Sequence, residues 1–295
     1  MLSRIADALY WMARYLERVD DTARAIQTDL LDLLDADGEA AGGRPPLLTP
    51  ERTSPSALRS SLRLARDNAR VARDRISDDM WETLHELWLH ADPLLAHPDA
   101  GDRMEPFCRF VRNEVARFHG VASGTMPRGE AFGFYELGTS VERADMTARI
   151  LDMEHHLVSP RDDGGDSAMD YYQWTALLRA LSGFDTYRRS HHAGLEPGAV
   201  IDFLVLSPEF PRSLRFSVEA TAHALDAIGS VPSARATLAA AATLRAAVVQ
   251  LPRTDGGNGV LHEFLRGLVA HVAAFDRALC EEFFQSTSGD VACAT

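Results

Sequence analysis

Apolar residues recur at intervals of three and four positions through almost all of this chain, and that spacing limits what it can fold into. Such a period places the apolar side chains on one face of an α-helix. No stretch of four to eight residues shows the alternation and hairpin turns that mark β-strands. We therefore predict an all-α fold, a multi-helix antiparallel bundle joined by loops.

The first predicted helix covers residues 3–35, and a Gly- and Pro-rich segment separates it from the helices that follow. Those helices are expected at 56–76, 78–97, 105–123, 130–158, 168–192, 197–206, 209–228, 232–250 and 260–285. A chain of 295 residues can bury an adequate core without disulfides. We predict one helical domain over residues 1–286 and a frayed tail at 287–295.

One phrase occurs twice. Residues 15–24 read YLERVDDTAR and residues 140–149 read SVERADMTAR, an offset of 125 positions (142 − 17 = 125). The matched residues are Glu17, Arg18, Asp20, Thr22, Ala23 and Arg24, which recur as Glu142, Arg143, Asp145, Thr147, Ala148 and Arg149. Core packing rarely needs the same acid, base and hydroxyl in the same order, so the repeat indicates a paired ionic site. It also suggests an internal duplication, with halves near 1–125 and 126–286.

The two copies have different surroundings. In the first copy Glu17, Asp20, Asp21 and Arg24 form a polar stripe opposite the apolar residues, which alone would be an ordinary solvated face. The second copy lies in a helix that is apolar on most sides, and such helices are normally buried. We therefore expect Glu142 to be at least partly inside the bundle.

Buried charges persist when they are paired and hydrogen-bonded. The other copy of the phrase is the natural source of partners. We expect Glu17 to pair with Arg149 and Glu142 with Arg24, or mixed forks that involve Arg18 and Arg143. Such a network would fix helix register or form a ligand or active site, unless the charges lie on a solvated face.

Other candidate contacts are weaker. Tyr171, Tyr172 and Trp174 would form either a ligand wall or the apolar anchor of a helix start. Arg212 and Ser213 lie near a predicted helix N-terminus, where backbone N–H groups favour anions. We expect no metal and no cofactor, because the chain lacks the motifs that hold them.

Composition excludes several classes of protein. A net charge of −13 argues against broad nucleic-acid binding. All 30 Lys+Arg residues are Arg, so neither a Schiff-base lysine nor a phosphate-loop lysine exists. Three scattered cysteines fit a reducing cytoplasm. We predict a cytoplasmic protein without a signal peptide or membrane span.

Several motifs together resemble the alpha-E family, a helical domain named for its Glu-Arg motif. They are Tyr10-Trp11-Met12-Ala13-Arg14-Tyr15-Leu16-Glu17-Arg18, Glu142-Arg143-Ala144-Asp145, Asp170-Tyr171-Tyr172-Gln173-Trp174 and Phe210-Pro211-Arg212-Ser213-Leu214. The family is similar to proteins found alongside a circularly permuted ATP-grasp ligase and a transglutaminase-like protein. The resemblance implies a role in making or modifying an amide- or peptide-linked product.

Three functions are compatible with these features. The first is an accessory or partner protein of the ATP-grasp amide-ligase system, which binds the ligase or an amino-acid or peptide substrate through the paired Glu/Asp/Arg site. The second is an enzyme that uses Glu17 and Glu142 as acid/base groups, with Arg212 holding an anionic substrate. The third is a structural scaffold without a site.

Overall fold

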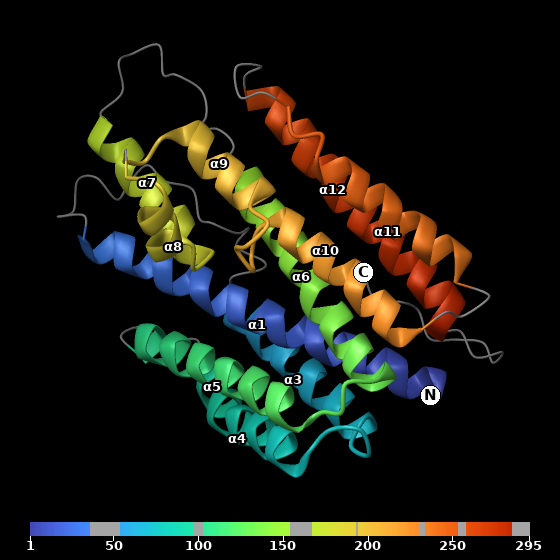
Figure 1. Cartoon of the computed structure of the whole chain (residues 1–295). Coiled ribbons are helices and arrows are strands. Elements are labelled where there is room, and N and C mark those ends of the chain that lie inside the picture. Colours follow the sequence, from blue (N-terminus) through green and yellow to red (C-terminus); the bar gives the residue numbers. More distant parts are fainter. Residues whose placement is uncertain are drawn as a thin grey trace.

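The chain folds into packed helices, as the spacing of its apolar residues predicts (Figure 1). The computed structural model describes residues 1–35, 54–96, 103–153, 167–192, 194–229, 234–252 and 258–284. Within these ranges every regular element is a helix, and none is long and apolar enough to cross a bilayer. The predicted tail at 287–295 lies outside the described residues.

The helices follow one another along the chain with these bounds: α1 (Ser3–Asp35), α3 (Pro55–Val71), α4 (Asp78–Leu95), α5 (Met104–Thr125), α6 (Glu130–Met153), α7 (Ser167–Ala180), α8 (Phe184–Ser190), α9 (Pro197–Leu206), α10 (Leu214–Ile228), α11 (Arg235–Val248), α12 (Asn258–Leu279) and the short π-helix η4 (Cys280–Phe284).

Local signals explain where several helices begin and end. Ser77 caps α4, since its Oγ accepts a hydrogen bond from the Met80 backbone N–H at 3.2 Å. Ser213 caps α10 in the same way, so this helix begins at Leu214 rather than at the predicted residue 209. The helix predicted over 168–192 is broken at Ser182, whose positive φ of 55° ends α7.

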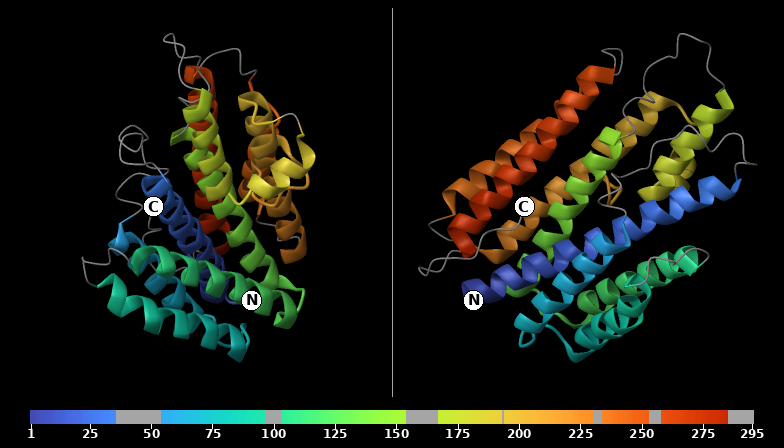
Figure 2. Two further views of the ribbon diagram at one scale, coloured as in Figure 1. Left: turned by 90° about the vertical axis from the view of Figure 1, so that its left-hand side faces the viewer. Right: turned by 180° about the vertical axis from the view of Figure 1, so that it is seen from behind.

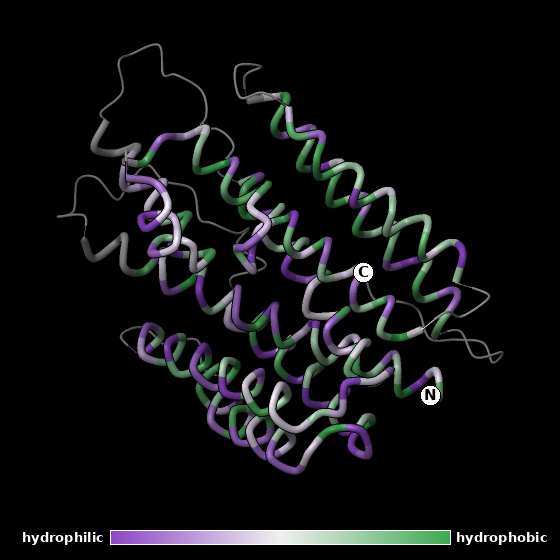
Figure 3. Tube along the Cα trace, viewed as in Figure 1, coloured by the Kyte–Doolittle hydropathy of each residue, from purple (hydrophilic) through white to green (hydrophobic). Residues whose placement is uncertain are grey.

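Helix α1 lies at the centre of the bundle, where it packs against α3, α5, α6 and α7 (Figure 1). Between Ile5 and Thr28 its residues are buried on every side, with Asp7, Trp11 and Arg18 the partly exposed exceptions. Hydrophilic positions nevertheless recur along it (Figure 3). Reading its polar stripe as a solvated face is therefore wrong, because helices from the second half of the chain cover that stripe.

The described helices include two sets of four, and the contact between α1 and α6 joins one set to the other (Figure 2). In the first set α1 packs on α3 and α5, α3 packs on α4, and α4 packs on α5. In the second set α6 packs on α10 and α12, α10 packs on α11, and α11 packs on α12. Helices α7, α8 and α9 are inserted between α6 and α10. The same order of contacts is what an internal duplication would produce, and the duplication itself stays a prediction.

The two central helices approach each other most closely at a glycine. A Cβ on Gly138 would lie 2.2 Å from the Tyr10 carbonyl oxygen and 3.0 Å from the Ala13 Cβ. Ala13 is the position that matches Gly138 in the register of the repeat (138 − 13 = 125). Small residues at this matched position let the backbones of α1 and α6 touch.

Gly138→Ala should therefore force α1 and α6 apart and lower the free energy of unfolding by about 3 kcal/mol, at the upper end of overpacking costs. Gly120→Ala on α5 is the matched control, because nothing lies within 4 Å of a Cβ there. That control should be neutral or gain up to about 1 kcal/mol from helix propensity. Urea denaturation measures both; equal effects of the two substitutions would contradict the close crossing.

Candidate functional site

The two copies of the repeat exchange ion pairs across the contact between α1 and α6. Arg143 of the second copy donates to Glu17 of the first at 2.5 Å. Arg18 of the first copy donates to both carboxylate oxygens of Glu142 of the second, at 2.6 and 3.2 Å. Each Glu-Arg dipeptide thus supplies the partner that the other needs, and the mixed forks are the pairs that form.

The direct pairs Glu17 with Arg149 and Glu142 with Arg24 are wrong. Arg149 donates instead to Asp145 on its own helix at 2.8 Å, and Arg24 pairs with Asp20 one turn earlier. Both arginines lie about two turns beyond the glutamates, farther from the crossing at Gly138. Only the residues nearer the crossing meet across the two helices.

The Glu17 cluster consists of Glu17, His119, Tyr135, Arg143 and Arg212. Glu17 is fully buried; Oε1 binds Arg143, and Oε2 accepts from Arg212 at 3.3 Å. Nε2 of His119, on α5, lies 3.1 Å from Oε1 but outside hydrogen-bonding alignment. The other ring nitrogen of His119 hydrogen-bonds the Tyr135 hydroxyl. One carboxylate therefore joins α1, α5, α6 and the segment before α10.

The Glu142 cluster consists of Tyr10, Arg14, Arg18, Glu142 and Asp276. Glu142 is also fully buried, and it accepts from Arg14 at 2.7 Å in addition to Arg18. Arg14 and the Tyr10 hydroxyl both donate to Asp276 on α12. This carboxylate network therefore joins α1, α6 and α12.

The clusters match each other beyond the phrase that first revealed them. Tyr10 and Tyr135 are related by the same offset (135 − 10 = 125), and each precedes the arginine of its own helix by eight positions (18 − 10 = 8). Sequence reasoning missed both tyrosines, although extending the register by two turns would have found them. Their partners, His119 and Asp276, differ in type and carried no comparable signal.

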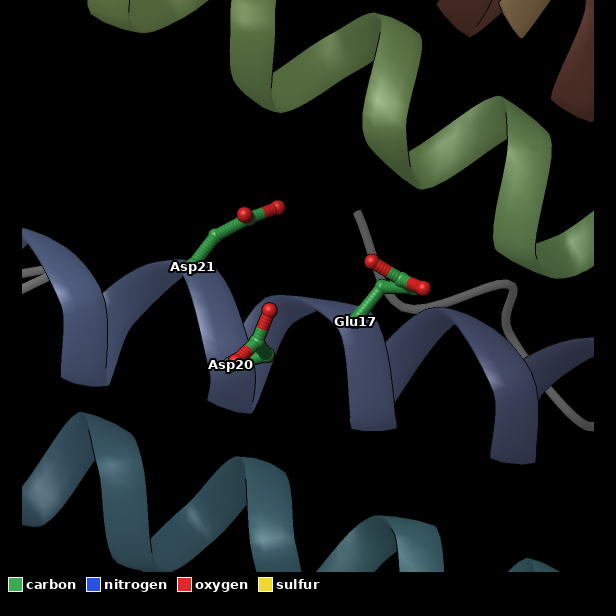
Figure 4. Close-up of side chains that lie close together, drawn as sticks. All are labelled: Glu17, Asp20 and Asp21. Atoms are coloured by element: carbon green, nitrogen blue, oxygen red, sulfur yellow. The ribbon is translucent and has the colours of Figure 1, made fainter. Parts of the chain in front are cut away.

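The first copy has an additional group of acids. Glu17, Asp20 and Asp21 bring carboxylate oxygens within 4.8 Å of one another on α1 (Figure 4). Arg212 donates to Asp20 at 2.6 Å and also binds Asp21. Its backbone carbonyl accepts a bond from Thr147 of α6 at 2.9 Å. Arg212, suggested above as an anion-binding residue, thus holds carboxylates of α1, and Ser213 caps a helix.

Three close carboxylates are also a geometry that can hold a cation. Here guanidinium groups take that place, because Arg143, Arg212 and Arg24 bind oxygens of Glu17, Asp20 and Asp21. Three guanidinium groups thus face three carboxyl groups. One acceptor, Oδ2 of Asp21, has no partner in the described part of the chain.

Both repeated glutamates are held ionised. Burial raises the pKa of Glu17, but Arg143, Arg212 and His119 outweigh it and hold the pKa well below its usual range. At Glu142 the balance of burial against Arg18 and Arg14 lowers the pKa to about 2. Near neutral pH such carboxylates carry no proton to donate, and they accept one poorly.

Asp21 behaves in the opposite way. Burial, the largest effect, raises its pKa to about 7, against the charge of Arg212 and with the help of Glu17 and Asp20. Asp21, next to Glu17 on α1, would therefore change its protonation near neutral pH.

The aromatic residues proposed as a wall do not share one face. Tyr171 and Tyr172 are exposed on α7, and their ring centroids lie 6.3 Å apart. Trp174 is buried, and its indole N–H has no acceptor among the described residues. Trp174 thus fits an anchor of α7, while the two tyrosines remain at the surface.

The raised pKa of Asp21 predicts a pH-dependent stability. The pKa of an unfolded Asp is near 3.9, whereas that of folded Asp21 is about 7. The folding stability contributed by protonated Asp21 is therefore fully present below about pH 4 and is lost as the pH rises through about 7. Asp21→Asn cannot ionise; relative to the wild type it should gain about 2 kcal/mol of unfolding free energy between pH 5 and pH 8. Urea denaturation at both pH values measures this, with Asp226→Asn at an exposed site of α10 as the control. A variant that keeps the wild-type pH dependence would contradict the assignment.

A family model of a predicted alpha-helical domain with a conserved ER motif, Alpha-E, matches residues 1–49 and 45–284. No curated protein and no solved structure matches the chain significantly. The Glu-Arg dipeptides at 17–18 and 142–143 are ER sequences, and they form the crossed ion pairs at the centre of the bundle. The match spans nearly the whole chain, and the chain belongs to the Alpha-E family.

Proposed function

We propose that this chain is a non-catalytic helical partner protein of a circularly permuted ATP-grasp amide-ligase system, and that its crossed Glu-Arg pairs are a structural lock. The observation that carries this proposal is the saturation of Glu17 and Glu142. Both are fully buried, and in each case arginine side chains bind both carboxylate oxygens. The ligase partnership is the one that the family resemblance implies.

Acid/base catalysis by Glu17 or Glu142 fits this geometry poorly. A general base must reach a substrate proton and needs a pKa near the operating pH. These carboxylates are enclosed by the bundle, and their pKa values lie far below neutrality. A role in holding α1 and α6 in register requires neither access nor titration.

The motif reaches the surface only through its arginines. Arg18 keeps 28% of its side chain exposed and Arg143 keeps 24%, while the glutamates that they bind are at 0%. A ligase or a peptide that recognises the motif would therefore meet guanidinium edges. Arginine edges suit acidic partners, because their planar fork pairs with carboxylates.

Co-expression with a circularly permuted ATP-grasp ligase from the same genome tests the partnership. We expect the two proteins to co-purify through size-exclusion chromatography and the ligase to gain activity or solubility. Absence of both co-purification and any effect on ligase activity would rule the partnership out.

Glu142→Gln separates a lock from an active site. Removing this charge takes the carboxylate from Arg18 and one of two carboxylates from Arg14, which keeps Asp276, and should cost about 3 kcal/mol of unfolding free energy. Glu219→Gln, which breaks the exposed pair with Arg245, is the control and should cost less than about 1 kcal/mol.

Denaturant titration measures both variants, and ligase activity is assayed below their unfolding midpoints. Full stability of Glu142→Gln combined with loss of pathway turnover would favour the alternative in which the chain is itself an enzyme.

A further inference from the structure

A second group of arginines lies beyond the Glu17 cluster, where α1 meets α5 and the turn between α7 and α8. We define the Arg24–Arg112 corner as Arg24 and Gln27 of α1, Arg112 of α5 and Ser182 of the turn. Arg24 donates one Nη to Asp20 and the other to the Ser182 hydroxyl. Arg112 donates to the side-chain carbonyl of Gln27.

Both arginines of the corner keep an unused donor. The Nε–H groups of Arg24 and Arg112 are buried and have no acceptor among the described residues. Arg24 as a whole is only 8% exposed. Buried N–H groups without partners are costly and uncommon, and two of them here indicate that an acceptor is missing.

The charges around the corner also indicate that it would accept a negatively charged group. The acids around the corner each have a partner of their own. Arg143 binds Glu17, Arg24 and Arg212 bind Asp20, and Arg212 binds one oxygen of Asp21. Glu105 accepts from Gln27 at 2.8 Å and pairs with Arg109. In the described part of the chain Arg112 has an amide partner and no carboxylate. Its pKa is lowered by burial and by the positive charges of Arg24 and Arg212, despite the opposing charge of Asp20. One more negative charge would relieve this repulsion.

Ser182, in the turn that ends α7, supplies the third polar group of the corner. It is the one non-glycine residue of the described chain with a positive φ, at 55°. The turn is held by hydrogen bonds from Ser182 N–H to the Arg179 carbonyl at 3.0 Å and from Gly183 N–H to the Leu178 carbonyl at 2.7 Å. Its hydroxyl is thereby fixed against Arg24.

We propose that Arg24 and Arg112, with the hydroxyl of Ser182, form a binding site for a small oxyanion, a carboxylate or a phosphate group. Such a group can accept bonds from two guanidinium forks at once, which uses the free Nε–H donors. Arg112 is only partly buried, so the ligand enters from the α5 side. A metal cation does not fit here, because the donors are positively charged. The site does not depend on the ligase partnership.

Isothermal titration calorimetry of the full chain tests the site, with inorganic phosphate and acetate as probes at constant ionic strength. We expect saturable binding of at least one probe. Arg112→Gln should weaken it about tenfold or more, the loss expected from one charge-assisted contact of about 1.4 kcal/mol. Arg117→Gln, an exposed position on α5 that pairs with surface acids, is the matched control and should bind as the wild type does.

The outcomes separate the sources of the oxyanion. Binding of phosphate alone identifies a phosphoryl ligand, and binding of acetate alone identifies a carboxylate. Because Arg112 has no carboxylate partner, Arg112→Gln should fold as stably as the wild type without a probe, which thermal unfolding checks. No saturable binding of either probe, or equal binding by wild type and Arg112→Gln, would overturn the proposal.

Discussion

The exchange of ion pairs across the contact between α1 and α6 is the interaction on which the rest of the bundle depends. Burying two carboxylates is expensive unless guanidinium groups bind them closely. The contact at Ala13 and Gly138 brings the helices near enough for Arg18 and Arg143 to reach the opposite glutamates. Arg14 and Arg212 complete the two networks and tie α12 and the start of α10 to the same centre.

The two clusters are matched in their core and differ at their margins. Asp20 and Arg24 are enclosed in the first copy, whereas Arg149 in the second keeps about a third of its side chain exposed. The reason is the segment with α7 to α9 between α6 and α10, which brings Ser182 and Arg212 onto α1. The first copy also has an additional acid, Asp21, and the matching position of the second copy is Met146. The first copy therefore carries the additional buried charged groups that the second copy lacks.

Much of this arrangement could be read from the sequence, and the remainder depends on packing between distant segments. Apolar spacing predicted the helices, and the apolar surroundings of Glu142 predicted its burial. The burial of the Glu17 stripe could not be predicted, because it requires helices from the other half of the chain to cover α1. The choice of crossed rather than direct pairs depends on where the helices cross, which only the small side chains at Ala13 and Gly138 mark. His119 and Asp276 belong to the site through tertiary contact alone.

The crossed pairs also bear on how the chain folds. Each set of four helices carries a glutamate whose arginine partner belongs to the other set. In a half that folded alone, the helices of the other half would not cover its glutamate, and that carboxylate would stay hydrated. The native burial of the two glutamates therefore requires that the two sets dock. Although the helices form two similar sets, their central ion pairs form only between them.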